Sequence, residues 1–253
     1  MKEEKIIRST HAAAKQLSER QKFQELFKNS PIPDNEILSN IGLYMRRQVI
    51  ARLLYMDELY RRIQTVPGII MECGVRWGQN MSFFISLRGI YEPFNQGRLI
   101  VGLDTFEGFV SIHEKDGSAA IAQNGAFGVT EDYEKHLKDI LAYHESEAPM
   151  NHIKKYELVK GDACKTISEY LKNRPETIIA LAYLDFDIYA PTHACLKALR
   201  PYLTKGSVLA FDELHMREFP GETIALQEVL GLSNCRLVRS PYAAGHQAYM
   251  VIE

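Results

Sequence analysis

Four acidic side chains stand directly after two short apolar stretches in the second half of the chain. Asp185 and Asp187 follow the stretch LAYL, and Asp212 and Glu213 follow the stretch SVLAF. If both stretches are neighbouring parallel strands, their carboxyl ends share the edge at which open α/β sheets bind ligands. Carboxylates that converge without His or Cys suit a hard cation, a proton or a polar substrate. The pattern therefore predicts a polar binding site at this edge.

Three earlier stretches of strand length also close on an acid. Glu72 closes the first, Asp104 closes the second, and Asp162 follows the third. Asp104 is placed to accept hydrogen bonds from the two hydroxyls of a ribose, and Asp162 from an adenine amino group. Gly74 and Gly78 would let the backbone approach a ligand closely before a helix begins. The alternative interpretation is a tight strand-to-helix turn followed by ordinary helix caps.

The turn after the first of these stretches narrows the choice of ligand. It reads CGVRWG, which is not the G-x-G-x-x-G that binds a pyrophosphate. Three acids in register beside a glycine turn instead favour a nucleoside without phosphates. S-adenosylmethionine fits, because it carries adenosine and a cationic sulfonium but no phosphate.

The elements that would position these acids alternate between strand and helix. Five apolar stretches of strand length are separated by helical segments; they span 68–75, 98–104, 156–160, 177–184 and 207–211. This alternation predicts a doubly wound, mostly parallel α/β sheet with helices on both faces. Residues 235–240 and 247–252 predict an antiparallel strand pair at the C-terminus, after a helix at 221–231.

The first 66 residues predict a helical arm or cap on a domain of residues 67–253. A first helix is expected up to about residue 30 and a longer one from about 35 to 65. The longer helix carries five arginines, which we assign to a solvated face. Alternatively, one of three side chains of this helix lines a substrate pocket or a subunit contact; they are Tyr44, Tyr55 and Met56.

A long loop is expected to cover the ligand edge of the sheet. Residues 105–130 are rich in Gly, Ser, Ala and Asn, and loops of this length in compact domains are usually lids or disordered segments. His113 and Phe127 are the loop residues that could touch an acceptor. Thr130 is expected to cap a helix that runs to about residue 147.

Composition excludes several classes of protein. The net charge of −2 comes without a basic tail, which argues against a nucleic-acid partner. No apolar run approaches the ~20 residues that span a bilayer, and the N-terminus lacks the apolar core of a signal peptide. The four cysteines form no C-x-x-C pair. We therefore expect a reduced, cytoplasmic protein without a membrane partner.

Four motifs together resemble one known family. ECGVRWGQN, GLDTFEGF, VKGDACKTI and LDFDIYAPT, followed by the Asp-Glu pair at 212–213, are similar to the TylF/MycF-type (macrocin) sugar O-methyltransferases. The likeness covers about residues 68–231. It implies the Rossmann-like fold of class I methyltransferases, S-adenosylmethionine as methyl donor and Mg²⁺ as metal.

The resemblance also implies roles for individual residues. Asp185, Asp212 and Glu213 would bind the metal, and Asp185 would be the general base, with Asp187 or His215 as alternatives. The implied cofactor-binding residues are Glu72, Gly74, Val75, Arg76, Gly78, Ser82, Asp104, Thr105, Phe106, Asp162, Ala163 and Asp185. This chain departs from the family pattern in three places. Glu213 replaces an Asp, Phe186 replaces a Gly, and the turn reads V-R-W-G where the family has V-W-R-G.

The sequence thus predicts an enzyme that methylates a sugar hydroxyl in natural-product biosynthesis. A bound cation would lower the pKa of the hydroxyl and orient the acceptor. The acceptor would be a glycosylated small molecule or a nucleotide sugar, and the amphipathic N-terminal helices predict a homo-oligomer. Two alternatives remain open. One is methylation of a phenol or catechol, and the other is a non-catalytic nucleoside-binding protein of the same fold.

Overall fold

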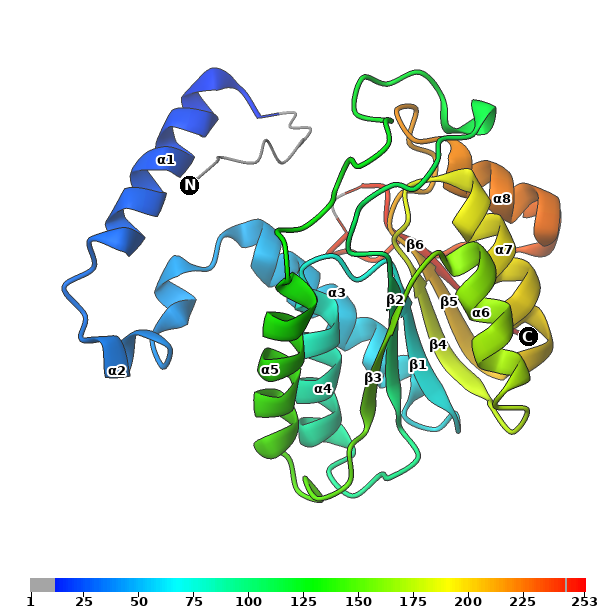
Figure 1. The fold of residues 1–253 in the computed structure, drawn as a ribbon, viewed down its shortest axis with the longest axis horizontal. Coiled ribbons are helices and arrows are strands. Elements are labelled where there is room, and N and C mark those ends of the chain that lie inside the picture. Colours follow the sequence, from blue (N-terminus) through cyan, green and yellow to red (C-terminus); the bar gives the residue numbers. More distant parts are fainter. Residues whose placement is uncertain (1–11, 244) are drawn as a thin grey trace.

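The protein is built around one six-stranded sheet (Figure 1). The computed structural model describes residues 12–243 and 245–253, so the first eleven residues of the predicted N-terminal arm lie outside the described part. The strands run in the order β3-β2-β1-β4-β5-β6. They are β1 Ile69–Cys73, β2 Ile100–Asp104, β3 Tyr156–Lys160, β4 Ile179–Leu184, β5 Leu203–Phe211 and β6 Ala248–Val251. All neighbours are parallel except β5 and β6. The predicted α/β class is confirmed.

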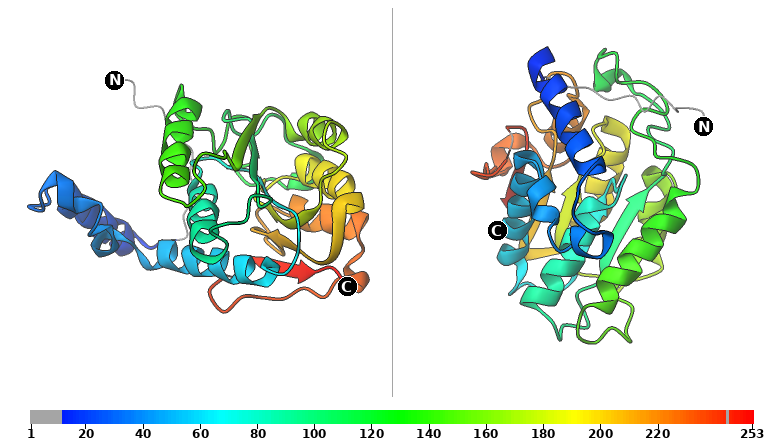
Figure 2. Two further views of the ribbon diagram at one scale, coloured as in Figure 1. Left: turned by 90° about the horizontal axis from the view of Figure 1, so that it is seen from below. Right: turned by 90° about the vertical axis from the view of Figure 1, so that its left-hand side faces the viewer.

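Helices cover both faces of the sheet and make two apolar cores (Figures 1 and 2). One face packs on α3 Arg47–Ile63, α4 Gln79–Tyr91 and α5 Tyr133–Ser146, and the other on α6 Ala163–Lys172, α7 Tyr189–Leu199 and α8 Gly221–Val229. Successive strand residues point to opposite faces. Ile70 lies in the first core and Met71 in the second. Because both faces are covered, β4 is buried throughout and reads as the continuous apolar run IALAYL.

The chain order reverses beside β1. This strand pairs with β2 on one side and with β4 on the other. Connections after β1 and after β4 therefore leave in opposite directions, which opens a crevice at the carboxyl ends of the strands. The turn after β1 and the acids after β4 and β5 all lie at this switch point.

The N-terminal segment departs from its prediction. Instead of one helix over 35–65, the chain forms α2 Asp34–Ile37, a 3₁₀ turn at Ile41–Tyr44 and then α3. Asn40 and Gly42 are poor helix formers, and Arg46 is extended before α3 begins. Upstream, α1 Ala14–Lys28 stands away from the sheet (Figure 1), and Phe27 of this helix packs edge-on against Tyr44.

Two other predictions were wrong at element ends. Helix α5 begins after Asp132, which has a left-handed φ of 58°, rather than directly after Thr130. Residues 235–240 form no strand, because the chain turns onto α3, where Ser240 hydrogen-bonds to Glu58. Only Val238 bridges to β6, at Tyr249.

The predicted lid is a folded segment. It contains a 3₁₀ turn at Glu114–Asp116, and the buried carboxylate of Asp116 accepts hydrogen bonds from the amides of His113 and Tyr189 at 2.8 and 2.6 Å. A small apolar cluster ties the lid to the start of α7; it includes Phe109, Ile121, Ala126, Ile188 and Phe219. None of the helices in the described residues has the length and apolar character needed to cross a bilayer.

Candidate active site

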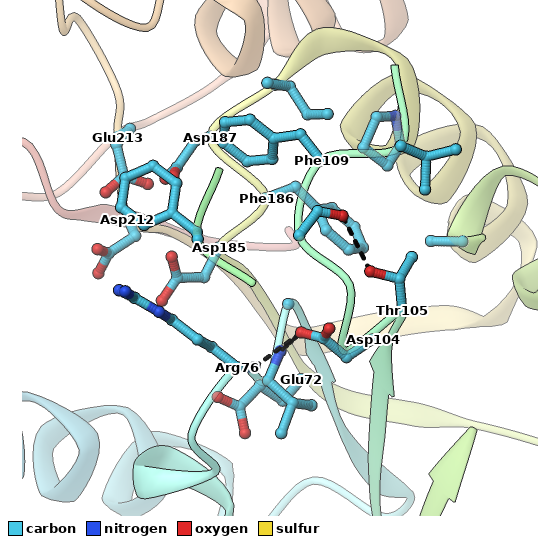
Figure 3. A pocket seen from close by; sticks show the side chains of 18 of the residues that line it. Glu72, Arg76, Asp104, Thr105, Phe109, Asp185, Phe186, Asp187, Asp212 and Glu213 are labelled. Atoms are coloured by element: carbon cyan, nitrogen blue, oxygen red, sulfur yellow. Dashed lines mark hydrogen bonds between the residues drawn. The ribbon is translucent and has the colours of Figure 1, made fainter. Parts of the chain in front are cut away.

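A cavity of ≈ 460 Å³ opens at the carboxyl ends of β1, β2, β4 and β5. Its wall brings together side chains from both halves of the sheet (Figure 3). Asp104 and Thr105 lie on one side, while Asp185, Asp187, Asp212 and Glu213 gather on the other. The sequence therefore placed these acids at the correct edge.

The turn after β1 brings its backbone against β4. Gly74 has φ +97°, and a Cβ added there would lie 2.0 Å from the carbonyl oxygen of Asp185. The carboxylate of Asp104 fixes this turn, because its Oδ2 accepts from the amides of Val75 and Arg76, both at 2.7 Å. The result is a backbone cradle, packed so closely on the end of β4 that only glycine fits at residue 74.

Replacing Gly74 with Ala should strongly weaken cofactor binding. The added methyl group clashes with backbone and takes a φ that favours Gly, so the turn must move. Trp77 lies in the cavity wall and is the only tryptophan of the sequence. Quenching of its fluorescence by S-adenosylmethionine measures the effect, and we expect affinity to fall at least about 100-fold. Gly42→Ala is the matched control, since nothing lies within 4 Å of that position. Unchanged affinity in Gly74→Ala would contradict the cradle.

Glu72 lies under the cradle at the end of β1. It is 1% exposed, and its Oε2 has no hydrogen-bond partner among the described residues. Burial, together with the nearby charge of Asp185, raises the pKa of Glu72 well above its usual value. A buried carboxylate with an unused oxygen beside a cavity calls for a polar or cationic ligand. S-adenosylmethionine, with its ammonium and sulfonium groups, meets that demand.

The two other predicted cofactor acids, Asp104 and Asp162, also accept hydrogen bonds from backbone amides. Asp104 Oδ1 accepts from the amide of Phe106 at 2.6 Å, so only Oδ1 retains capacity for a further donor. Asp162 caps α6 by accepting from the amide of Cys164 at 3.0 Å, and it also lines the cavity. The helix-cap interpretation is thus correct for Asp162. The ribose and adenine contacts stay predictions.

Three of the four clustered acids face one another. One oxygen from each of Asp185, Asp187 and Glu213 lies within 4.8 Å of the other two. Burial and then the neighbouring carboxylates raise the pKa of Asp185 and of Glu213. Burial also raises the pKa of Asp187 to about 6. Glu213 Oε2 is buried and has no hydrogen-bond partner in the described chain. This donor set fits a hard cation such as Mg²⁺.

Asp212, the fourth acid, faces an arginine from α3. Arg52 donates to Asp212 Oδ2 at 3.0 Å and, at 3.4 Å, to Asp185 Oδ2. Tyr183 donates to Asp212 Oδ1, and Gln247 does so at 3.3 Å. Burial alone would raise the pKa of Asp212, but the charge of Arg52 and hydrogen bonds with Glu213, Tyr183 and Arg52 hold it below its usual value. Asp212 is therefore a paired anion.

Arg52 is the functional residue that the sequence reasoning misplaced. Our assignment of the arginines of this helix to a solvated face was wrong for Arg52, which lines the cavity. The sequence position of Arg52 indicates that it shares a helix face with the buried residues of α3, which recur at helical spacing from it. They are Tyr55, Met56, Leu59, Tyr60 and Ile63. An arginine on a buried stripe needs an acid, and the cluster supplies two.

The other predicted residues divide into those that line the cavity and those that do not. Val75, Arg76, Thr105 and Ala163 line it, as does Phe127 of the lid. In the described residues four others lie elsewhere; they are Gly78, Ser82, Phe106 and His215. Ser82 hydrogen-bonds within α4, and the exposed His215 has its Nε2 3.0 Å from the carbonyl oxygen of Gly245. Tyr55 and Met56 are core residues, so they do not form a pocket wall.

Comparison with known proteins identifies close relatives of known structure. A scan of protein-family models and a search of curated proteins find no match. Among solved structures, CalS11, described as a calicheamicin methyltransferase, has 44% sequence identity and a TM-score of 0.92 over 96% of this chain and 94% of its own. The apo structure of CalS11, described as a TDP-rhamnose 3'-O-methyltransferase, has 42% identity and a TM-score of 0.84 over 96% of both chains.

A third structure shares the fold alone. The O-methyltransferase NovP has 19% identity and a TM-score of 0.61 over 80% of each chain. The CalS11 match, in contrast, has 44% identity over 96% of this chain. This chain therefore belongs to the TylF/MycF-type sugar O-methyltransferases, a family of class I S-adenosylmethionine-dependent enzymes.

Proposed function

We propose that the protein methylates a hydroxyl of a nucleotide-linked deoxysugar in the biosynthesis of a natural product. The observation that carries this proposal is the 42–44% identity to a TDP-rhamnose 3'-O-methyltransferase over 96% of the chain. The cavity supports it, because buried acids stand opposite the predicted cofactor residues. S-adenosylmethionine, when bound, supplies the methyl group and its cationic leaving sulfur.

The protein's own residues would hold and deprotonate the acceptor. Asp185 lies at the cavity floor with a pKa raised by burial, which suits a group that takes a proton from a hydroxyl near neutral pH. The lid would exclude water, since Phe109, Phe127 and Phe219 form an aromatic wall with ring centroids 5.3–6.2 Å apart. These side chains also suit the apolar face of a deoxysugar.

A magnesium ion is part of the proposal. The carboxylates after β4 and β5 fit such an ion, which would polarise the acceptor hydroxyl when bound. The family resemblance assigns it to Asp185, Asp212 and Glu213, and this assignment stays a prediction.

A homo-oligomer and a cytoplasmic location complete the proposal. Within the described residues α1 buries no side chain, and large apolar groups of the N-terminal segment are exposed; they include Leu26, Phe27, Leu38 and Leu43. A second copy of the chain would cover them, and light scattering tests this. The four cysteines are free thiols, as expected in a reducing compartment.

The function is tested by offering the enzyme two acceptors. TDP-rhamnose and a catechol are incubated separately with S-adenosylmethionine and Mg²⁺, and mass spectrometry detects the methylated product. The proposal expects a mass gain of one methylene on the sugar nucleotide only. Methylation of the catechol alone would replace the sugar by a phenolic acceptor.

A further inference from the structure

Arg52 pairs more closely with Asp212, at 3.0 Å, than with Asp185, at 3.4 Å, and this difference bears on the ligands of the proposed metal. We infer that a divalent ion in this protein is bound by Asp185, Asp187 and Glu213, while Arg52 keeps Asp212 out of the metal's coordination shell. The inference deepens the proposed function, since it rests on a metal-assisted reaction. It departs from the ligand set that the family resemblance implies.

Three of the roughly four acceptor positions of the Asp212 carboxylate are already in use. Its Oδ1 accepts from Tyr183 and Gln247, and its Oδ2 accepts from Arg52. The side chain is only 6% exposed, so the Arg52 pair is little screened by solvent. An ion bound to Asp212 would have to displace a donor from Oδ1 or share Oδ2 with the Arg52 guanidinium, which repels it. Arg52 therefore already supplies the cation that Asp212 needs.

Asp187 is better placed than Asp212 to bind an ion together with Asp185 and Glu213. One of its oxygens lies within 4.8 Å of oxygens from Asp185 and Glu213. Asp187 also has a left-handed φ of 62°, a conformation that costs energy in a residue with a side chain. This strain is accounted for if the position must direct a carboxylate toward the other two.

The replacement of Asp by Glu at residue 213 fits the same arrangement. A longer side chain lets the carboxylate reach the Asp187 side of the cavity. The buried Glu222 fixes the base of this side chain, because its Oε2 accepts from the Glu213 amide at 2.7 Å. Glu213 Oε2 is buried and lacks a hydrogen-bond partner in the described residues, as a ligand oxygen awaiting a cation would. The longer Glu213 side chain and the Arg52 pair thus lead to one shifted ligand set.

Metal binding by the full-length chain, without acceptor, tests the inference. Mn²⁺ serves as the probe, and its affinity is measured by calorimetry and by the loss of the free-ion paramagnetic signal. Asp187→Asn and Asp212→Asn are a matched pair, since each removes one charge from the cluster. We expect Asp187→Asn to weaken binding at least about 10-fold, and Asp212→Asn to change it less than about threefold. The reverse order, or no Mn²⁺ binding by the native chain, overturns the inference.

Arg52→Gln provides a second measurement that a merely structural role would not move. Without the guanidinium, Asp212 becomes available, so Mn²⁺ should bind about 10-fold more tightly. In that background Asp212→Asn should weaken binding at least about fivefold, although it has little effect in the native chain. Equal effects of Asp212→Asn in both backgrounds contradict the inference.

Trp77 fluorescence with S-adenosylmethionine confirms that each variant is folded. Sugar methylation that persists in the presence of a chelator would reject the metal while leaving the proposed function intact.

Discussion

Asp185→Asn is expected to lower kcat for methyl transfer about 10³-fold, because the amide cannot accept the acceptor's proton. Asp185 is the acid whose backbone carbonyl abuts Gly74 and whose carboxylate faces both Arg52 and the other acids. It therefore stands between the cofactor cradle and the acid cluster. The amide keeps the size of the side chain, so S-adenosylmethionine affinity should change less than about fivefold.

The measurement combines single-turnover methylation with titration of Trp77 fluorescence. Glu218→Gln is the control, since Glu218 is exposed, follows β5 and lies outside the cavity wall. Full turnover by Asp185→Asn with a chelator present would reject both the base and the metal-assisted scheme. Loss of cofactor affinity together with activity would instead make Asp185 a cofactor-binding residue.

The location of the site was predictable from the order of the strands. Carboxyl ends of parallel strands meet at one edge, so the acids at the carboxyl ends of β1, β2, β4 and β5 had to converge once the alternation was recognised. Glu72, Asp104 and Asp185 line one cavity for that reason. The covering of β4 on both faces was equally visible in its unbroken apolar run.

Strand order did not predict which acids are paired within the protein and which remain available to a ligand. Asp185 and Asp212 are equivalent in the sequence pattern, and only the packing of α3 across the sheet gives Asp212 an arginine. Asp104 shows the same limit. It closes a strand as expected, but its carboxylate accepts from three backbone amides, two in the glycine turn and one at Phe106. Tertiary contacts from distant elements decide which strand-end acids remain available to a ligand.

His215 illustrates why proximity in sequence misleads at a strand end. It follows Asp212 and Glu213 closely, yet its backbone takes a left-handed φ of 51° and its ring turns to Gly245. A tight turn after β5 thus sends successive side chains in different directions. Residues that come from other elements, such as Phe109 of the lid, reach the cavity instead.

Glu145→Ala is expected to lower the free energy of unfolding by about 3–5 kcal/mol, because it leaves two buried cations without their shared anionic partner. Glu145 forms ion pairs with Arg88 and with Lys155, each at 2.5 Å, and the two basic side chains are 1% and 3% exposed. Their attraction to Glu145 offsets the cost of burial, and without it they repel one another.

Urea unfolding measures the change. Glu134→Ala is the control, because its two partners, Lys138 and Lys160, are both exposed, which makes each pair worth at most about 0.5 kcal/mol. A loss in Glu145→Ala no larger than in the control would show that these cations find other acceptors. The pair lies at the far end of α5, so methyl transfer per folded molecule should be unchanged.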